Sequence, residues 1–141
     1  MKRTAIAIAF LIVVFVLASN ISFADCGISV DFSTLDFGSL TPDGTSSDKS
    51  ITITKTGADP ITNLTVEGSD WINGLGMSVT QTHWTLSDID YGSMSQLETF
   101  PQSIGTDVSQ ESPAMVHFKL KIPLNQPSGG YTQAITFTSV C

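Results

Sequence analysis

Arginine is nearly absent from this 141-residue sequence: Arg3 is the one arginine, and five lysines accompany it. Proteins that bind nucleic acid displace counterions with clustered lysine and arginine, and arginine is the side chain that most often reads base edges. The 13 acidic residues and the formal net charge of −7 point the same way. The composition argues against nucleic acid as a partner and suits a soluble protein, or one that meets a cation-rich surface.

Long apolar runs are also scarce, since the sequence has one, at residues 5–17. Its 13 residues fall short of the roughly 20 that a membrane-spanning helix needs, and no later run reaches that length. Basic residues precede it, and the small residues Ser22 and Ala24 follow at the positions that signal peptidase reads. This pattern predicts a signal peptide over residues 1–24, cleaved after Ala24.

Export has consequences for the rest of the chain. Cleavage would leave residues 25–141, a length that suits one compact domain. It would also remove Lys2 and Arg3, which takes the formal net charge from −7 to −9. We expect a secreted protein, extracellular or at the cell surface, with no stable membrane span in the mature chain.

Motifs for catalysis are missing as well. The sequence has no Gly-x-Ser-x-Gly elbow, no phosphate-binding glycine loop and no cysteine beside a plausible base. His83 and His117 are its two histidines, and neither has a cysteine or glutamate at the spacing of a zinc site. We therefore expect no enzyme activity, no catalytic residue, no cofactor and no metal ligand.

One pair of carboxylates leaves a metal question open. Asp88 and Asp90 share a predicted loop, and carboxylates at this spacing can donate oxygens to Ca²⁺. An acidic chain produces such pairs by composition alone, and the twelve-residue EF-hand pattern is missing. Acidic loops without a metal are the preferred interpretation.

The residues that are abundant favour β-structure. Thr, Ser, Ile, Val and Gly dominate residues 25–141, and apolar residues alternate with polar ones at the period of a half-buried strand. The alternation predicts about seven short strands, including one over 78–86 and one over 97–104 that Pro101 would place at an edge. Short strands at this spacing predict an antiparallel β-sandwich over residues 25–141, without helices. The predicted core consists of Ile28, Val30, Phe32, Phe37, Ile51, Ile53, Leu64, Val66, Val116, Phe118, Leu120, Ile122, Ile135 and Phe137.

Two stretches carry a family resemblance. The first comprises Leu35–Pro42 with its Asp-Phe-Gly, then Ile51–Gly57 and Pro60–Leu64; the second is Ile122–Phe137, with a Pro and Gly-rich turn before Tyr131. Together they resemble the opening and the final hairpin of immunoglobulin-like β-sandwich domains on prokaryotic surface proteins. This resemblance implies an immunoglobulin-like fold and a surface location, but no specific activity.

The same stretches more weakly resemble secreted pilin-like and spore-coat-like subunits. Those subunits begin with a cysteine on the first strand, as Cys26 does here, and continue to a Phe-Gly pair such as Phe37-Gly38. They usually close the second strand with another cysteine, where this chain has Lys55 and Thr56. This second resemblance implies a subunit that assembles at the surface.

Cys26 and Cys141 are the two cysteines, near the predicted new N-terminus and at the last residue. An even cysteine count in an exported protein favours a disulfide. A bridge within the chain is preferred, but an odd number of strands would put the two thiols at opposite poles and favour bonds between subunits. Both arrangements stay open.

Two further features could mark a surface function. Asn63-Leu64-Thr65 is a glycosylation sequon, with Asn63 on the outward parity of its strand. Trp71 and Trp84 would form a stacking platform for a glycan if they were exposed, although a sandwich of this size more often buries a tryptophan in its core.

The sequence thus predicts a non-enzymatic cell-surface protein, a structural or interaction subunit of a filament, coat or envelope assembly. Its partners would be other copies of itself or other surface proteins, through edge-to-edge or pole-to-pole contact rather than exchange of a terminal strand. The alternative is a secreted module that binds a glycan or a protein through its pole loops.

Overall fold

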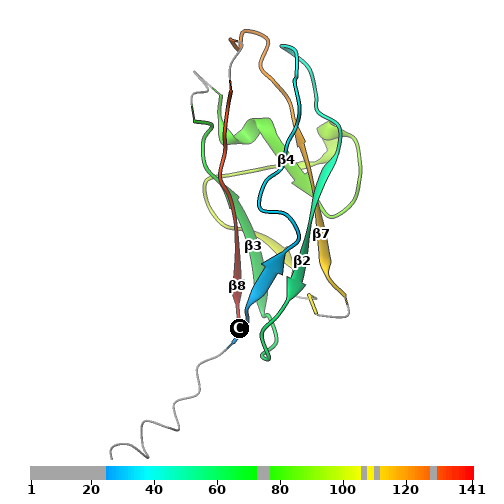
Figure 1. Ribbon diagram of the computed structural model, residues 1–141, viewed down its shortest axis with the longest axis vertical. Helices are drawn as coiled ribbons and strands as arrows, with labels where there is room; N and C mark the ends of the chain where they lie inside the picture. The colour runs from blue at the N-terminus through cyan, green and yellow to red at the C-terminus, as the bar shows by residue number, and fades with distance from the viewer. Residues whose placement is uncertain (1–24, 73–76, 106–107, 110–111, 128–129) are drawn as a thin grey trace, which may run out of the picture.

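A computed structural model describes residues 25–72, 77–105, 108–109, 112–127 and 130–141. Within them, eight strands form two antiparallel sheets (Figure 1). The strands are β1 (Ile28–Val30), β2 (Lys49–Lys55), β3 (Asn63–Gly68), β4 (Thr82–Thr85), β5 (Ser95–Gln96), β6 (Gln102–Gly105), β7 (Ala114–Leu120) and β8 (Ile135–Val140). One sheet has the order β1-β2-β7-β4-β5 and the other β6-β3-β8. The described part is therefore an all-β antiparallel sandwich, as predicted.

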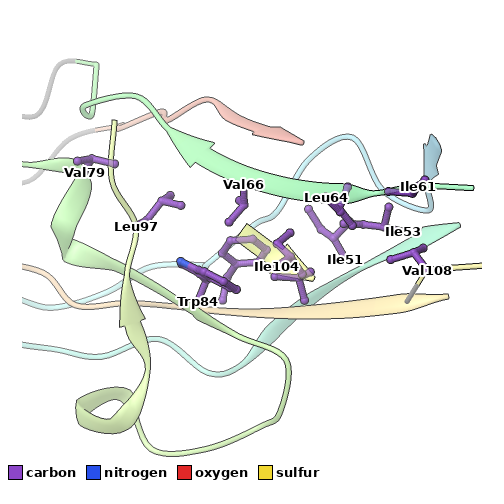
Figure 2. Close-up of a cluster of buried hydrophobic side chains, with 12 residues drawn as sticks. Ile51, Ile53, Ile61, Leu64, Val66, Val79, Trp84, Leu97, Ile104 and Val108 are labelled. Atoms are coloured by element: carbon purple, nitrogen blue, oxygen red, sulfur yellow. The ribbon is translucent and has the colours of Figure 1, made fainter. Parts of the chain in front are cut away.

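The core lies between the two sheets. Alternate residues of β3 and β7 point inward, and Leu64, Val66, Val116 and Phe118 are fully buried because the opposite sheet covers them. In Figure 2 the side chains of β3 point toward Trp84 and the isoleucines of the other sheet. These positions confirm the inward parity predicted for the central strands.

The core prediction is wrong for two residues. Val30 is 41% exposed and Phe32 is 60% exposed. Strand β1 ends at Val30, because the Asp31 carboxylate accepts a hydrogen bond from the Thr52 N–H (2.8 Å), and the chain leaves the sheet edge there. The following residues form a coil segment, so period-two burial does not continue into them.

Two predicted strands are also shorter than the alternation suggested. In place of a strand over 78–86, a 3₁₀ turn (Val79–Gln81) precedes β4, and the Ser78 hydroxyl accepts a hydrogen bond from the Thr80 N–H. In place of a strand over 97–104, coil precedes β6, which begins after Pro101 because proline cannot donate to a ladder.

The chain closes one side of the sandwich where it crosses between the sheets. The Gln102 amide of β6 donates to the carbonyl of Gln96 in β5 (2.9 Å), and its oxygen accepts from the indole N–H of Trp84 (3.1 Å). The Gly68 N–H also donates to the Glu98 carbonyl. This side, between β5 and β6, therefore has both backbone and side-chain links.

A disulfide joins the opposite side at one end. Cys26 and Cys141 are bonded, with their Cα atoms 5.6 Å apart. The bond ties the start of β1 in one sheet to the end of β8 in the other, and Figure 1 shows these two ends of the described chain together. The bridge within the chain, one of the two arrangements left open by the sequence, is the one present.

None of the helical turns within the described ranges has the length and apolar character to cross a membrane. The predicted signal peptide, residues 1–24, and its cleavage site after Ala24 lie outside the described residues and stay predictions.

Candidate functional site: an open groove beside strand β8

Beyond the disulfide, the side of the sandwich between β1 and β8 is open. An apolar groove of about 840 Å³ runs there. Residues 30, 32–40 and 42 line one side, β8 and residues 130–133 line the other, and Ile51, Leu120 and Ile122 also line the groove. The groove therefore extends from the surface to buried core side chains between the two sheets.

The β8 wall presents incompletely covered core side chains. Ile135 and Phe137 point inward and are half-buried, whereas Val66, the β3 residue paired with Phe137, is fully buried. The ring of Phe137 meets that of Phe118 edge to face, with centroids 6.3 Å apart. Ile135 and Phe137 thus belong to the core by parity but have groove space on one side.

The same wall has a free backbone edge. Strand β8 pairs with β3 and has no second neighbour in its sheet among the described strands. The carbonyls of Thr132, Ala134 and Val140 accept hydrogen bonds from the β3 side. Because successive residues of a strand direct their backbone groups to opposite edges, the N–H and C=O groups of Ile135 and Phe137 are directed toward the groove.

One end of this edge is covered. The Ser139 hydroxyl donates to the Cys26 carbonyl (2.6 Å), next to the disulfide. The groove is therefore closed at the Cys26 end, and the uncovered edge of β8 runs from Gln133 to Phe137.

The opposite wall is largely apolar and carries one acidic residue. Phe32 is largely exposed, while Leu35 and Phe37 are half-buried against the core. Asp31 does not line the groove, because its carboxylate accepts a hydrogen bond from the Thr52 N–H of β2. Desolvation acts to raise the pKa of this carboxyl, but the hydrogen bonds from Thr52 and from neighbouring backbone outweigh it and lower the pKa. Asp36, on the same wall, is the one charged residue among those that line the groove in the described ranges.

The far end contains buried hydrogen-bond donors. Trp71 packs against Met77 and Ile122, and Gln126 is 7% exposed; both side chains line the groove. The indole nitrogen of Trp71 and the amide nitrogen of Gln126 have no hydrogen-bond partner within the described ranges. This end therefore combines apolar surface with donors.

The acidic loop considered for calcium lies elsewhere. Lys119 donates to the Asp88 carboxylate (2.9 Å) and to the Ile89 carbonyl (2.6 Å). Asp88 is thus engaged by a cation, and the hydrogen bond with Lys119, reinforced by its charge, holds the pKa of the carboxyl below its usual value. Within the described ranges, no group of three or more His, Cys, Asp or Glu side chains could hold a metal ion.

The two histidines have separate partners. Ring nitrogen Nδ1 of His83 lies 2.9 Å from the Tyr91 carbonyl, and the two rings stack with centroids 3.9 Å apart. Nδ1 of His117 lies 2.7 Å from the Asp48 carboxylate. The register of β4 and β7 makes the two histidines diagonal neighbours on one face of the sheet, but each ring nitrogen has a different partner.

The glycosylation candidate lies in the middle of a sheet. Asn63 begins β3 between β6 and β8, is half-buried, and accepts a hydrogen bond from the Ser103 hydroxyl (2.8 Å). Glycosylation there stays a prediction. Of the two tryptophans, Trp84 is buried and hydrogen-bonded, so it offers no stacking face.

Sequence reasoning missed the groove as a site. Some of the residues that line it, among them Val30, Phe32, Ile135 and Phe137, were predicted as core from their parity. Nothing in the alternation shows whether a strand has a neighbour. The sequence contained one signal, because the first and the last predicted strands could each lie at the edge of a sheet. In the structure, β1 and β8 are such edges, and the disulfide joins them at one end.

Comparison with known proteins identifies no family: no family description and no curated protein matches the chain. Among solved structures, the P pilus rod subunit PapA is 15% identical, with a TM-score of 0.48 over 86% of this chain and 95% of PapA. A family 123 glycoside hydrolase from Clostridium perfringens is 17% identical, with a TM-score of 0.48 over 81% of this chain. The chain spans about a quarter, 24%, of the length of that hydrolase.

Proposed function

We propose that this chain is a non-enzymatic exported protein of the cell surface, a structural or interaction subunit that joins a filament, coat or envelope assembly through its groove. The observation that carries the proposal is the apolar groove beside an unpaired strand edge. Exposed apolar surface and an open edge are both costly in an isolated soluble protein, and natural proteins usually cover such edges. A groove of this kind is therefore best explained as a contact surface for another protein.

The disulfide supports export. Disulfides form and persist in oxidising compartments, and Cys26–Cys141 joins residues 115 positions apart in a small domain. The leader-like residues 1–24 and the family resemblance of residues 35–64 and 122–137 agree with a surface location.

The glycan-binding alternative has less support. The two tryptophans considered as a stacking platform for a glycan do not form one, because Trp84 is buried and Trp71 packs against the cluster of Met77, Leu120 and Ile122. In the loop around Asp88, the carboxylate of Asp88 and the ammonium group of Lys119 already pair with each other.

The test is the state of the native protein on producing cells. A gentle surface extract would be separated by native electrophoresis and by velocity sedimentation, and the intact surface would be imaged with an antibody against residues 25–141. We expect the protein in assemblies larger than a monomer. A monomer in the extract together with no labelled surface structure would overturn the proposal.

A further inference from the structure

The groove specifies the chemistry of what fills it through two independent features. The N–H and C=O groups of Ile135 and Phe137 are directed into the groove and can be satisfied by another backbone in extended conformation. The side chains of the same two residues are half-buried and can be covered by apolar side chains that enter between the sheets.

We infer that the groove binds an extended segment of a partner polypeptide, which pairs with β8 and places alternate apolar side chains between the two sheets. The inference rests on the proposed function, because it names the kind of partner that the same groove takes. In such a complex, the partner segment would be the second neighbour of β8 in its sheet.

The length of the segment follows from the uncovered edge. The edge runs from Gln133 to Phe137, since Cys26 and the disulfide cover Ser139. At a rise of about 3.3 Å per residue, this stretch is about 17 Å long and matches five or six residues of an added strand. Every second side chain points inward, so two or three apolar residues would fill the groove.

The charge of the groove constrains the segment further. The groove is lined by apolar and uncharged polar side chains apart from Asp36. None of these lining residues is basic, so the one charge among them is negative. The complementary segment has no acidic residue within the groove and carries a lysine or arginine where it passes Asp36.

The segment must come from outside the two terminal strands of the folded domain. The disulfide holds the start of β1 and the end of β8 together, so neither can swap into a second groove while the bond is intact. This restriction agrees with the expectation that the protein does not exchange a terminal strand.

Defined peptides test the inference on the exported, disulfide-bonded protein, labelled with ¹⁵N. The probe is a nonapeptide of alternating isoleucine and threonine with a lysine at each end, and its control has aspartate at the isoleucine positions. We expect the first peptide to shift the amide resonances of Ile135 and Phe137 and the aspartate peptide to leave them unchanged. Equal shifts with both peptides, or none with either, would overturn the inference.

Two N-methylated forms of the probe separate backbone pairing from simple apolar contact. One carries methyl groups on the isoleucine amides and the other on the threonine amides, which block opposite edges of the peptide strand. Because a single edge pairs with β8, we expect their dissociation constants to differ by about tenfold or more. Equal dissociation constants for the two methylated peptides would contradict strand pairing.

A matched pair of variants locates the binding surface. Phe32 is 60% exposed on the groove wall, and Phe100 is 59% exposed and does not line the groove. Phe32→Asp should weaken binding of the probe about tenfold, while Phe100→Asp leaves it within about twofold. Equal weakening in the two variants would overturn the assignment to the groove.

The peptides also separate this inference from the proposed function. If the probe fails to bind but the native protein forms surface assemblies, the strand inference is wrong and the proposed function stands. If the probe binds as expected but the native protein is a monomer without a surface structure, the proposed function is wrong and the groove still binds an extended segment. Saturable shifts of Ile135 and Phe137 with maltohexaose, without shifts from the peptide, would assign the groove to a glycan and overturn the inference.

Discussion

Phe118 and Phe137 meet edge to face across the sandwich, with ring centroids 6.3 Å apart and ring planes inclined by 70°. Phe118 is fully buried in the middle of its sheet, whereas Phe137 lies on the edge strand and is half-buried. The two rings contact each other, but protein encloses Phe118 on all sides, whereas Phe137 also lines the groove. This difference marks the boundary between the closed core and the groove.

Truncation of the two rings should therefore have unequal effects on stability. Phe118→Ala empties a fully enclosed site and should lower the free energy of unfolding by about 3 to 5 kcal/mol. Phe137→Ala should cost less than half as much, because solvent already reaches its site. Met115→Ala, on the same strand as Phe118 but 49% exposed, is the control and should change stability by less than about 0.5 kcal/mol. Urea unfolding measures all three, and equal losses at Phe118 and Phe137 would contradict the open groove.

The disulfide should contribute most of its stability by restricting the unfolded chain. Cys26 and Cys141 are 115 residues apart, and the chain-entropy relation gives about 4 to 5 kcal/mol for a loop of this size. The double variant Cys26→Ser, Cys141→Ser should lose about that much in urea unfolding. On a non-reducing gel the wild type should migrate faster than after reduction, and the double variant should not respond to reductant. A covalent ladder of wild-type protein would contradict a bridge within the chain.

A buried serine should matter more than its exposed neighbour. Ser46 is 6% exposed, and its hydroxyl accepts a hydrogen bond from the Leu120 N–H (2.9 Å) where the chain joins the end of β7. Ser46→Ala leaves that buried N–H without its partner and should cost about 1 to 3 kcal/mol. Ser47→Ala, at the next and exposed position, is the matched control and should be nearly silent in the same urea experiment.

The ion pair of Asp88 and Lys119 should give a pH-dependent contribution to stability. The hydrogen bond and charge of Lys119 lower the pKa of the Asp88 carboxyl from its usual 3.8. A group whose pKa is lower in the folded state stabilises the fold above its unfolded pKa and loses that contribution as pH falls through the folded pKa. The difference in unfolding free energy between wild type and Asp88→Asn should therefore be present at about pH 6 and vanish at about pH 2.

Urea midpoints at several pH values measure this difference, and Lys119→Met supplies the control background. In that background Asp88→Asn should have no comparable pH-dependent effect, because the cation that lowers the pKa is gone. Added salt should reduce the difference in the wild-type background, since both groups are near the surface. A difference that persists unchanged at about pH 2 would exclude the ion pair as its source.

Local sequence predicted the central strands well and their neighbours poorly. In β3 and β7, alternation predicted the inward faces correctly, because each of these strands has a partner on both sides and a sheet above it. Around Trp84 the same alternation predicted too long a strand, since the Ser78 hydroxyl and the 3₁₀ turn satisfy the backbone locally. Periodicity records which side chains face inward but does not record where a ladder begins.

The candidate site shows the same limit. Val30, Phe32, Ile135 and Phe137 were all predicted as core residues, and all four line the groove. Their apolar parity is present in the sequence, but their exposure depends on the absence of a strand between β1 and β8 in the described fold. The sequence therefore contained the apolar residues of the site without its location.

By itself, the sequence determined that residues 25–141 form antiparallel β-structure, with Phe118 and its inward neighbours in the core, because side-chain periodicity is a local property of the chain. Only the tertiary structure decided which edges meet. It brought Cys26 beside Cys141, closed the side between β5 and β6 through Gln102, and left the edge of β8 open. Pairing between strands depends on contacts between residues far apart in the chain, and such contacts leave no periodic pattern in the sequence.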